Sequence, residues 1–496
     1  MVSFGMKCGL LMGFGSVMVV FGAVVVAYWP PIYMSSLQNM MALTPLSMSF
    51  TIWREVPIPM YLECFLFNIT NVNEILAGEN VSINVAQMGP YVFREYHKKE
   101  NIAWNRNHTV IFYNKRSWQY VPEKSNGSLD DLVTNVSPVI ATIGHIMRHR
   151  GRIENTAVDF FLRAYHSNIF MTATASDWLF DGIEDPVLDI ANEIPFLPIQ
   201  IPFDKFGWFY QRNGSLDYEG VFLMNTGTDD FSKLGSLEKW RHYNRTMYRD
   251  ECGEVKGSTG ELWAPELGQE EVVVFAPDIC TYMVLAKTQT VTIQGIEGVQ
   301  YAHNDSVFDN GHRYEYTACY CDEVRDSDCL PSGALNVSSC RFGAPAFVTR
   351  PHFYNTDPHY PSKITGLHPT EEHNFRLALE MFTGMPLAVS AQLQINFLVR
   401  HRAGLTINNQ LPDPDTLVPM FWFRQEVEVS PDYARMARVA IRVRYWVPYA
   451  LYALTAIGIA LLIWAVVIIT MRLMKRSGDK EPILNESVSE ENPPTQ

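Results

Sequence analysis

Six of the eight cysteines lie close together in the second half of the chain: Cys252, Cys280, Cys319, Cys321, Cys329 and Cys340. Clustered cysteines serve two chemistries, zinc binding and disulfide formation. Zinc-binding pairs usually have two to four residues between the cysteines, whereas a single residue separates Cys319 from Cys321. The cluster therefore favours three disulfides, for which fifteen connectivities are possible from the sequence alone, and it predicts an oxidising compartment.

The long stretch between two apolar segments near the ends of the chain, which includes this cluster, is rich in Asn-x-Ser/Thr sequons, the acceptor sequence for N-glycosylation. A single match is weak, but a series of matches places the region outside the cell or in a lumen. The candidate acceptors are Asn68, Asn80, Asn107, Asn126, Asn135, Asn213, Asn244, Asn304 and Asn336. Asn135 is the weakest of these, because Pro138 follows its Ser.

Catalytic and metal-binding motifs are absent from the sequence. There is no Gly-x-Ser-x-Gly elbow, no Gly-rich phosphate loop and no His-Glu-x-x-His motif. His145 and His149 share one face of a predicted helix, but two ligands are too few for a metal site. The sequence therefore predicts a protein without enzymatic activity and without a cofactor. A net charge of -14 also argues against nucleic acid as a partner.

Two uncharged segments decide how the chain meets a membrane. Residues 8–28 and 446–471 are each long enough to cross a bilayer as a helix. We interpret the first as an uncleaved anchor, because its apolar run is long for a signal peptide and Trp29-Pro30-Pro31 is a poor cleavage site. With the sequons outside, the prediction is a two-pass plasma membrane protein with cytosolic residues 1–7 and 472–496 and an ectodomain of residues 29–445.

Both predicted cytosolic ends carry candidate modification or sorting signals. Cys8 lies at the inner edge of the first span and is a palmitoylation candidate, with an unmodified thiol as the alternative. In the tail, Asp479, Ile483 and Leu484 are arranged like an acidic dileucine sorting signal, although an ordinary charged tail explains the composition equally simply. Such a signal predicts an endosomal or lysosomal pool.

Hydrophobic patterning predicts an α+β ectodomain, an antiparallel β domain with a helical insert. Residues 391–399 alternate, with Leu393 and Phe397 on one side and Gln394 and Asn396 on the other. Five further runs have strand composition: Pro59–Phe67, Pro90–His97, Thr109–Lys115, Val272–Ala276 and Leu417–Phe423. Residues 129–179 show helical spacing, which Pro138 should split. A further helix should begin at Ser430-Pro431.

Short motifs in collinear order give the chain a family resemblance. They include Trp29-Pro30, Met88–Phe93, Gly182–Pro186, Asp278–Cys280, Cys319–Cys321, Pro351–Phe353, Gly366–Pro369, Thr383-Gly384 and Val418–Trp422. With the two terminal membrane segments and the late cysteine cluster, this layout resembles the class B scavenger receptor family. The stretches Ser125–Asp131, Thr226–Asp230 and Met420–Phe423 are most similar to its insect croquemort type.

The resemblance implies a fold, a disulfide pairing and a function. The fold is a β-barrel-like core with an apical helical bundle and an internal hydrophobic tunnel for lipid. The pairing is Cys252–Cys319, Cys280–Cys340 and Cys321–Cys329. The function is a receptor for lipid, modified lipoprotein or anionic particles that mediates lipid uptake or engulfment. The alternative is a lysosomal membrane protein that binds or sorts a lumenal protein partner, and a homo-oligomer stays open.

One departure from the family concerns its apical lysines, which gather anionic ligands in some members. The corresponding stretch of this chain has no lysine and offers a different basic set: Arg148, His149, Arg150, Arg152, Arg163 and His166. Arginine pairs with carboxylate and phosphate at least as well as lysine does. These residues are therefore candidate ligand contacts, with a solvated helix end as the alternative.

Overall fold

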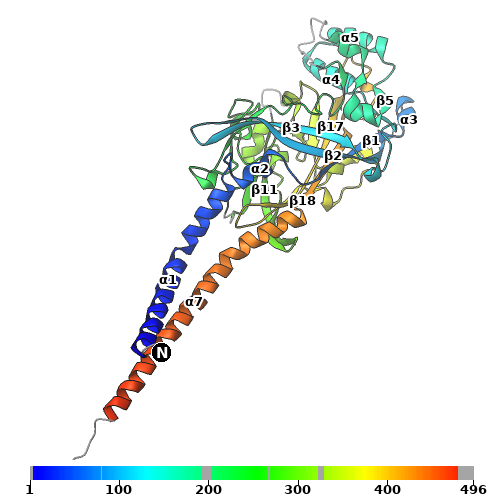
Figure 1. Cartoon of the computed structure of the whole chain (residues 1–496). Coiled ribbons are helices and arrows are strands. Elements are labelled where there is room, and N and C mark those ends of the chain that lie inside the picture. Colours follow the sequence, from blue (N-terminus) through cyan, green and yellow to red (C-terminus); the bar gives the residue numbers. More distant parts are fainter. Residues whose placement is uncertain (1–3, 80, 192–202, 266–268, 322–328, 479–496) are drawn as a thin grey trace, which may run out of the picture. The chain divides into compact units, whose positions relative to one another are not determined.

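The computed structural model (Figure 1) describes residues 4–79, 81–191, 203–265, 269–321 and 329–478. The chain divides into two compact units, Met40–Ala434 and a second unit made of both termini. The helices are α1 Phe4–Met41, α2 Met48–Arg54, α3 Val72–Leu76, α4 Pro138–Ile146, α5 Arg152–Tyr165, α6 Pro186–Ala191 and α7 Pro431–Gly478. The long strands are β1 Met60–Ile69, β2 Ile83–Trp104, β3 Thr109–Tyr120, β11 Thr281–Ile293, β12 Ile296–His303, β17 Pro386–Arg400 and β18 Asp415–Glu428.

Shorter strands complete the β structure. They are β4 Leu132–Val136, β5 Phe170–Thr174, β6 Ile183–Glu184, β7 Lys205–Phe206, β8 Val221–Asn225, β9 Leu237–Trp240, β10 Glu271–Ala276, β13 Leu335–Asn336, β14 Ala346–Thr349, β15 Ile364–Thr365 and β16 Arg376–Leu379. The main sheet runs in the order β10-β11-β12-β16-β17-β18-β1-β2-β3-β8-β9. Every pairing along this path is antiparallel.

The two ends of this path are joined by one short segment, so the sheet is a nearly closed barrel. Ser258 forms bridges both to Ser236, beside β9, and to Val274 of β10. Its carbonyl accepts from the Phe275 N–H at 2.8 Å, and its N–H donates to the Val273 carbonyl at 3.0 Å. This contact satisfies backbone groups that an open sheet edge would expose. The predicted barrel-like β core is confirmed.

The six predicted strand segments all lie in strands, but the expectation of a polar outer side for residues 391–399 is wrong. Gln392, Gln394 and Asn396 are as buried as the apolar residues between them. β14 pairs with β17 along residues 394–397, where Asn396 donates to the Phe347 carbonyl at 3.2 Å. The turn at Pro351–Phe353 contacts β17, and the His352 N–H donates to the Gln394 side chain at 2.7 Å. A polar side chain survives burial when it is hydrogen-bonded, and these positions are part of the interior.

The predicted helical insert contains two helices and also two strands, β4 and β5, that the sequence analysis included in the helical region. Residues 132–136 form β4, which pairs with β5 from Val133–Ala173 to Val136–Phe170. The helix begins only after this strand, at α4, where the Ser137 hydroxyl accepts from the Ile140 N–H and Pro138 occupies the first turn. The segment ends in a single wide helical turn at Asp177–Asp181.

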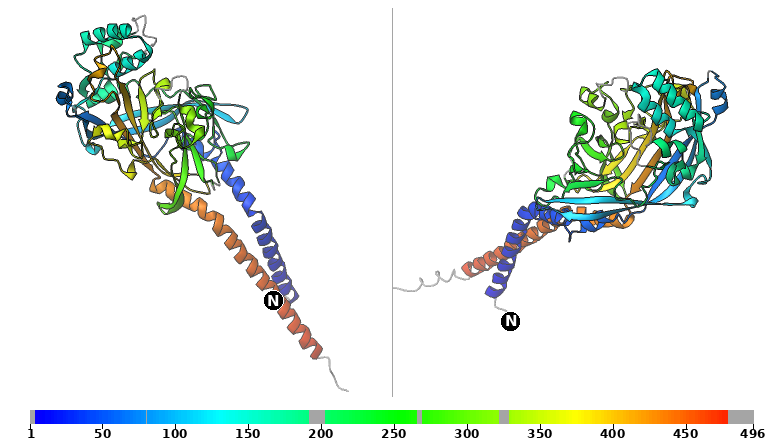
Figure 2. Two further views of the ribbon diagram at one scale, coloured as in Figure 1. Left: turned by 180° about the vertical axis from the view of Figure 1, so that it is seen from behind. Right: turned by 90° about the horizontal axis from the view of Figure 1, so that it is seen from above.

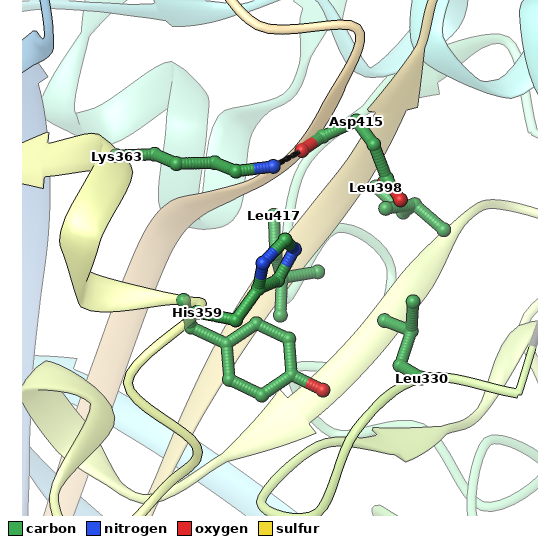
Figure 3. Close-up of a pocket in the computed structure, with 7 residues that line it drawn as sticks. Leu330, His359, Lys363, Leu398, Asp415 and Leu417 are labelled. Carbon is green, nitrogen blue, oxygen red and sulfur yellow. Dashed lines mark hydrogen bonds between the residues drawn. The ribbon is translucent and has the colours of Figure 1, made fainter.

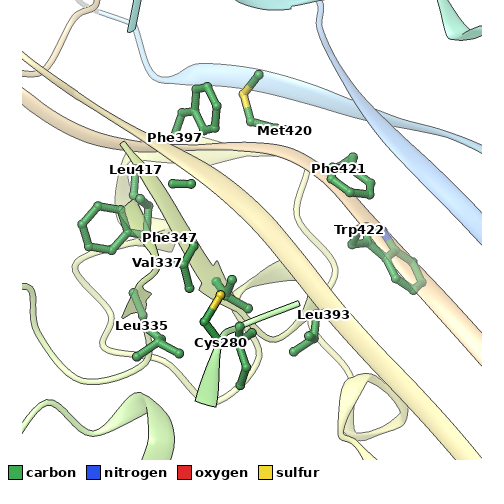
Figure 4. Packing of buried hydrophobic residues seen from close by; sticks show 14 of the residues in the cluster. Cys280, Leu335, Val337, Phe347, Leu393, Phe397, Leu417, Met420, Phe421 and Trp422 are labelled. Carbon is green, nitrogen blue, oxygen red and sulfur yellow. The ribbon is translucent and has the colours of Figure 1, made fainter. Parts of the chain in front are cut away.

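The core of Met40–Ala434 lies between the inner surface of the sheet and the segments that follow the cysteine cluster. Phe397 of β17 and Met420 of β18 pack toward Phe347 of β14 and Leu335 of β13 (Figure 4). Cys280 contributes to the same cluster. This wall is aromatic and aliphatic, and it fixes the distance between the long strands and the disulfide-bonded segments.

The terminal unit consists of α1 and α7, the two described helices long and apolar enough to cross a membrane. Both are longer than predicted. α1 continues through Pro30 and Pro31 to Met41, and the helix predicted at Ser430-Pro431 is continuous with the second span. The Trp29 indole N–H donates to the Arg444 carbonyl at 3.1 Å, and the Tyr33 hydroxyl donates to the Ala440 carbonyl at 3.0 Å.

Small residues let α1 and α7 approach closely. A Cβ at Gly458 would lie 2.9 Å from the Gly15 carbonyl oxygen and 3.0 Å from the Met18 Cβ. A Cβ at Gly15 would lie 3.0 Å from the Gly458 carbonyl oxygen. Close backbone approach through glycine is typical of helix association in membranes. The hydrophobic effect does not drive helices together in lipid, so association depends on tight van der Waals packing.

We predict that Gly458→Leu separates α1 from α7 and lowers stability, because the new side chain meets backbone atoms that cannot move aside. Overpacking of this kind costs about 1–3 kcal/mol. The measurement is the thermal unfolding midpoint of the full-length chain in detergent micelles. Gly13→Leu is the matched control, since a Cβ at Gly13 meets nothing within 4 Å. Equal midpoints for the two variants would contradict close packing at Gly458.

Candidate ligand-binding surface

α4 and α5 form one end of the Met40–Ala434 unit, the end away from α2 and from the last residues of β18 (Figures 1 and 2). The segment that connects β17 to β18 supports both helices. Gly144 of α4 lies so close to Asn408 that a Cβ would be 2.1 Å from its Nδ2. Asn155 of α5 donates to the Ala403 carbonyl at 3.1 Å. Both helices therefore pack on the connection between β17 and β18, two long paired strands of the sheet.

The inner side of α5 is held by a buried carboxylate. The Oδ1 atom of Asp159 accepts from the Ile407 N–H at 2.8 Å, and its Oδ2 accepts from Arg163 at 3.2 Å and from the Thr406 hydroxyl. Val158 and Leu162 are buried beside it. Three donors on one carboxylate fix the rotation of α5 about its axis, because a buried charge needs all of its partners.

The outer side of α5 is also apolar, which the sequence did not reveal. Ile153, Ala157, Phe160 and Ala164 follow each other at helical spacing and are exposed, with Ile153 at 87% and Phe160 at 80%. Thr156 and the charged residues Arg152 and Arg163 flank this row on one side. An exposed apolar row with a basic margin is typical of helices that bind at a lipid interface.

The six predicted basic contacts do not form one cluster. His149, Arg150 and Arg152 are exposed together around the turn between α4 and α5, and the half-buried Arg148 donates to the His145 carbonyl at 2.8 Å. Arg150 lies 3.7 Å from Glu154, an exposed pair that leaves it accessible.

The other two basic residues lie at the far end of α5, about 16 Å along the helix from Arg152. Arg163 bonds to Asp159, and His166 lies 3.2 Å from the buried Asp185. These two residues therefore contribute to the stability of the fold through their carboxylate partners. The accessible basic group is therefore His149, Arg150 and Arg152.

The structure separates one sequon from the others. Asn135 is 1% exposed, and its amide nitrogen donates both to the Phe67 carbonyl at 2.8 Å and to the Pro419 carbonyl at 3.0 Å. A glycan on this nitrogen is incompatible with the folded interior, so the prediction for Asn135 is wrong. The acceptors with exposed or half-buried side chains stay predictions: Asn68, Asn107, Asn126, Asn213, Asn244, Asn304 and Asn336. Asn80 lies outside the described residues.

The six clustered cysteines form three disulfides, and the pairs are those that the family resemblance implied. They are Cys252–Cys319, Cys280–Cys340 and Cys321–Cys329, with Cα–Cα distances of 5.8, 6.6 and 5.1 Å. Cys8 is free and buried in the helix pair of the terminal unit, so its palmitoylation stays a prediction. Asp479, Ile483 and Leu484 lie outside the described residues.

A buried histidine forms a polar centre that the sequence analysis missed. The His352 Nε2 donates to Gln87 at 2.7 Å, and the same Gln87 oxygen accepts from the Trp422 indole at 2.8 Å. The His352 Nδ1 accepts from the His368 N–H at 3.2 Å. One nitrogen that donates and one that accepts specify a neutral ring. Burial, with His373 and His368 nearby, lowers the pKa of His352 to about 3.

A small hollow beside this region has room for about one water molecule. Its volume is about 10 Å³, and its lining includes His359, Tyr360, Leu398, Leu417 and Lys363, which donates to the Asp415 carbonyl (Figure 3). An acyl chain does not fit this space. The predicted lipid tunnel therefore draws no support from this hollow and stays a proposal.

The comparisons with known proteins agree with this architecture. The model of the CD36 family matches residues 13–469. Protein peste of Drosophila melanogaster is 34% identical over 79% of this chain and 70% of its own length. Scavenger receptor class B member 1 of Sus scrofa is 32% identical over 90% and 86%, and lysosome membrane protein 2 of Homo sapiens is 29% identical over 83% and 84%. The chain belongs to the CD36 family, as the motifs predicted.

We predict that His352 makes stability fall with acidification across the endosomal range. Its folded pKa of about 3 lies below the ordinary value of 6.5, so the unfolded chain takes up a proton first as pH falls. The stabilisation is present above pH 6.5 and declines toward pH 3. It amounts to a loss of about 2 kcal/mol at pH 5 relative to pH 7.

The measurement is the unfolding free energy of the full-length chain at pH 7 and pH 5, compared with that of His352→Gln. Glutamine keeps a donor for Gln87 but does not titrate, so the loss between the two pH values should shrink. His359→Gln, at an exposed position, is the control. The same pH dependence in wild type and His352→Gln would exclude this role for His352.

Proposed function

We propose that this chain is a scavenger receptor that binds lipid-bearing, anionic particles through the outer surface of α5 and the adjoining basic turn. Its targets are modified lipoproteins, fatty acids, and apoptotic or microbial surfaces, and binding leads to lipid uptake or engulfment. The single observation that carries the proposal is the exposed row Ile153, Ala157, Phe160 and Ala164 beside Arg150 and Arg152, on a member of the CD36 family.

Two individually weak interactions, apolar burial and attraction to headgroups, act together at this surface. Burying an exposed aromatic or aliphatic side chain in a lipid surface is worth about 1.5–3 kcal/mol. Guanidinium groups at the margin add attraction to anionic headgroups, at about 1 kcal/mol each. Neither contribution alone selects anionic lipid over neutral lipid or over a soluble anion. Together they favour a surface that offers both an apolar interior and negative headgroups.

The place of this surface in the unit suits a receptor. Chain connectivity puts Met40 and Ala434 of the ectodomain next to the terminal helices, and α5 lies at the opposite end from α2 and the end of β18. A ligand captured there is held away from the connection to the membrane helices. Transfer of single lipids through the barrel follows from the family resemblance. A conduit spares an acyl chain about 0.8 kcal/mol of exposure per methylene group.

A second candidate function is that of a lysosomal membrane protein that binds or sorts a lumenal protein. It is favoured by the likeness to lysosome membrane protein 2, which extends over most of both chains. The two functions use the same end of α4 and α5 differently. Binding of a lumenal protein does not require that the ligand carries negative charge, whereas the receptor function requires lipid with negative charge.

We predict that Phe160→Ser and Ile153→Ser together reduce binding to liposomes of phosphatidylserine and phosphatidylcholine by at least about tenfold, because two anchoring side chains are lost. Arg150 and Arg152 changed to Glu should reduce it further, by repelling the headgroups. The measurement is liposome capture by cells that display equal amounts of each variant.

The matched control is Met381→Ser, which removes an exposed apolar side chain far from α5 in the sequence. Capture by this variant should equal that of wild type. The receptor proposal fails if the α5 variants capture as many anionic liposomes as Met381→Ser does. Neutral phosphatidylcholine liposomes should be captured poorly by every variant.

A further inference from the structure

Three arginines from separate segments surround Tyr218 in the loop before β8. The guanidinium carbon of Arg212 lies 3.8 Å from the centre of the Tyr218 ring, and that of Arg341 lies 5.9 Å from it. Arg341 also donates to the Tyr218 hydroxyl at 2.7 Å, and Arg241 donates to the Tyr218 carbonyl at 2.6 Å. The ring and carbonyl of one tyrosine thus hold three cations close together.

Negative charge beside these cations is scarce. Among the described residues, Asp278 has the only carboxylate within 4.0 Å of Arg212 or Arg341, and it lies 3.7 Å from each, beyond hydrogen-bond distance. Within the described part of the chain, the hydrogen bonds of the Arg241 guanidinium go to the main-chain carbonyls of Tyr218 and Glu219, and the group stacks on Trp240.

The nearby Glu219 does not supply the missing charge, because other residues already engage its carboxylate. Arg116 lies 2.6 Å from it, and Asn114 donates to it at 2.8 Å. The guanidinium groups of Arg212 and Arg341 consequently share one distant carboxylate, that of Asp278.

The crowding of cations has an electrostatic signature. Burial lowers the pKa of Arg212, and the neighbouring charge of Arg341 lowers it further. The same two causes lower the pKa of Arg241. Arg341 itself, which contacts Tyr218 and Asp278, has a raised pKa in spite of its burial. An added anion would therefore offset the electrostatic repulsion from Arg341 that Arg212 and Arg241 experience.

The cluster is both rigid and open to solvent. Asp278 and Arg341 lie two residues and one residue from the disulfide Cys280–Cys340, which ties their segments together. The side chains of Arg212, Arg341 and Asp278 are 18%, 22% and 36% exposed. A preorganised set of donors with access from solvent is what a small ligand requires.

An apolar surface adjoins the arginines. Phe342 follows Arg341, is 50% exposed, and has a φ of 55°, a left-handed conformation that is strained for a bulky residue. Its ring meets Phe203 edge to face, with the centroids 5.4 Å apart. A ligand with an anionic group and an apolar part long enough to reach from the arginines to Phe342, the residue after Arg341, would combine the two kinds of contact.

We propose that Arg212, Arg341 and Arg241 form a binding site for an oxyanion, a carboxylate or phosphate group, beside Tyr218. Arg212 presents a planar fork of N–H donors that matches two oxygens of such a group. Arg341 donates through one terminal nitrogen to the Tyr218 hydroxyl and through the other to the Asp278 carbonyl, and it adds its remaining N–H groups and its charge. Asp278 weakens the site by competing for the same donors. The anion is either the headgroup of an amphiphile, whose chain lies on Phe342, or a free oxyanion. The site is separate from α5 and does not depend on the proposed receptor function.

The test is equilibrium dialysis of radiolabelled octanoate and of inorganic phosphate against the full-length chain in phosphatidylcholine nanodiscs, with empty nanodiscs as the blank. Arg212→Gln should weaken binding by about tenfold or more, since a charge-assisted bond is lost. Asp278→Asn should strengthen binding by roughly fivefold, since a competing charge disappears. Arg313→Gln, an exposed arginine 3.5 Å from Asp305, should change nothing.

Opposite effects of the Arg212 and Asp278 variants are the decisive result, because a damaged fold weakens binding in both. Octanoate binding with this pattern identifies an amphiphile headgroup, and phosphate binding alone identifies a free oxyanion. The proposal is overturned if neither probe binds, or if Asp278→Asn binds no more tightly than wild type. Liposome capture through α5 is measured independently, so failure here leaves the receptor proposal untouched.

Discussion

The pairing of β17 with β18 is the constraint on which the rest of the ectodomain depends. The two strands stay in register from Ala388–Glu428 to Arg400–Asp415, with one irregularity, and they occupy the middle of the sheet. Their connection, residues 401–414, carries the partners of Asp159 and thereby sets which side of α5 faces outward. Moving this register by one residue would turn the side chains of the displaced strand to the opposite side of the sheet and would release the helices that form the proposed binding surface.

Strands could be predicted from the sequence where their residues repeat with a period of two, and helices where a start signal was present. The error at Leu132–Val136 has a physical cause. Leu132 and Val136 have helical spacing with Val139, but the partner strand β5 lies more than thirty residues away, and only the folded chain brings it near. Tertiary pairing overrode the local pattern, as it commonly does for short apolar segments.

The binding surface itself was less predictable than the fold, because spacing does not reveal which apolar side of a helix is covered. Val158 and Leu162 lie on the buried apolar side of α5, but Ile153 and Phe160 have the same helical spacing on the exposed side. For some polar residues the sequence predicted exposure where the structure shows burial. Asn135 carries a sequon and Gln394 lies in an alternating strand, yet both are buried with their hydrogen bonds satisfied by the interior.

The cationic groups of this acidic chain divide by how close their carboxylates lie. Arg163 and Arg116 have buried acids at hydrogen-bond distance, so their charge stabilises the fold and is not offered to a ligand. Arg152 is exposed and Arg212 reaches its acid only at 3.7 Å, so these two keep donors that a ligand can use. In a protein of net charge -14, such sites attract anions only at short range, because the surrounding field repels them. An anionic ligand must therefore bring apolar contact as well, and both Arg152 and Arg341 have an exposed aromatic or aliphatic neighbour in the chain, Ile153 and Phe342.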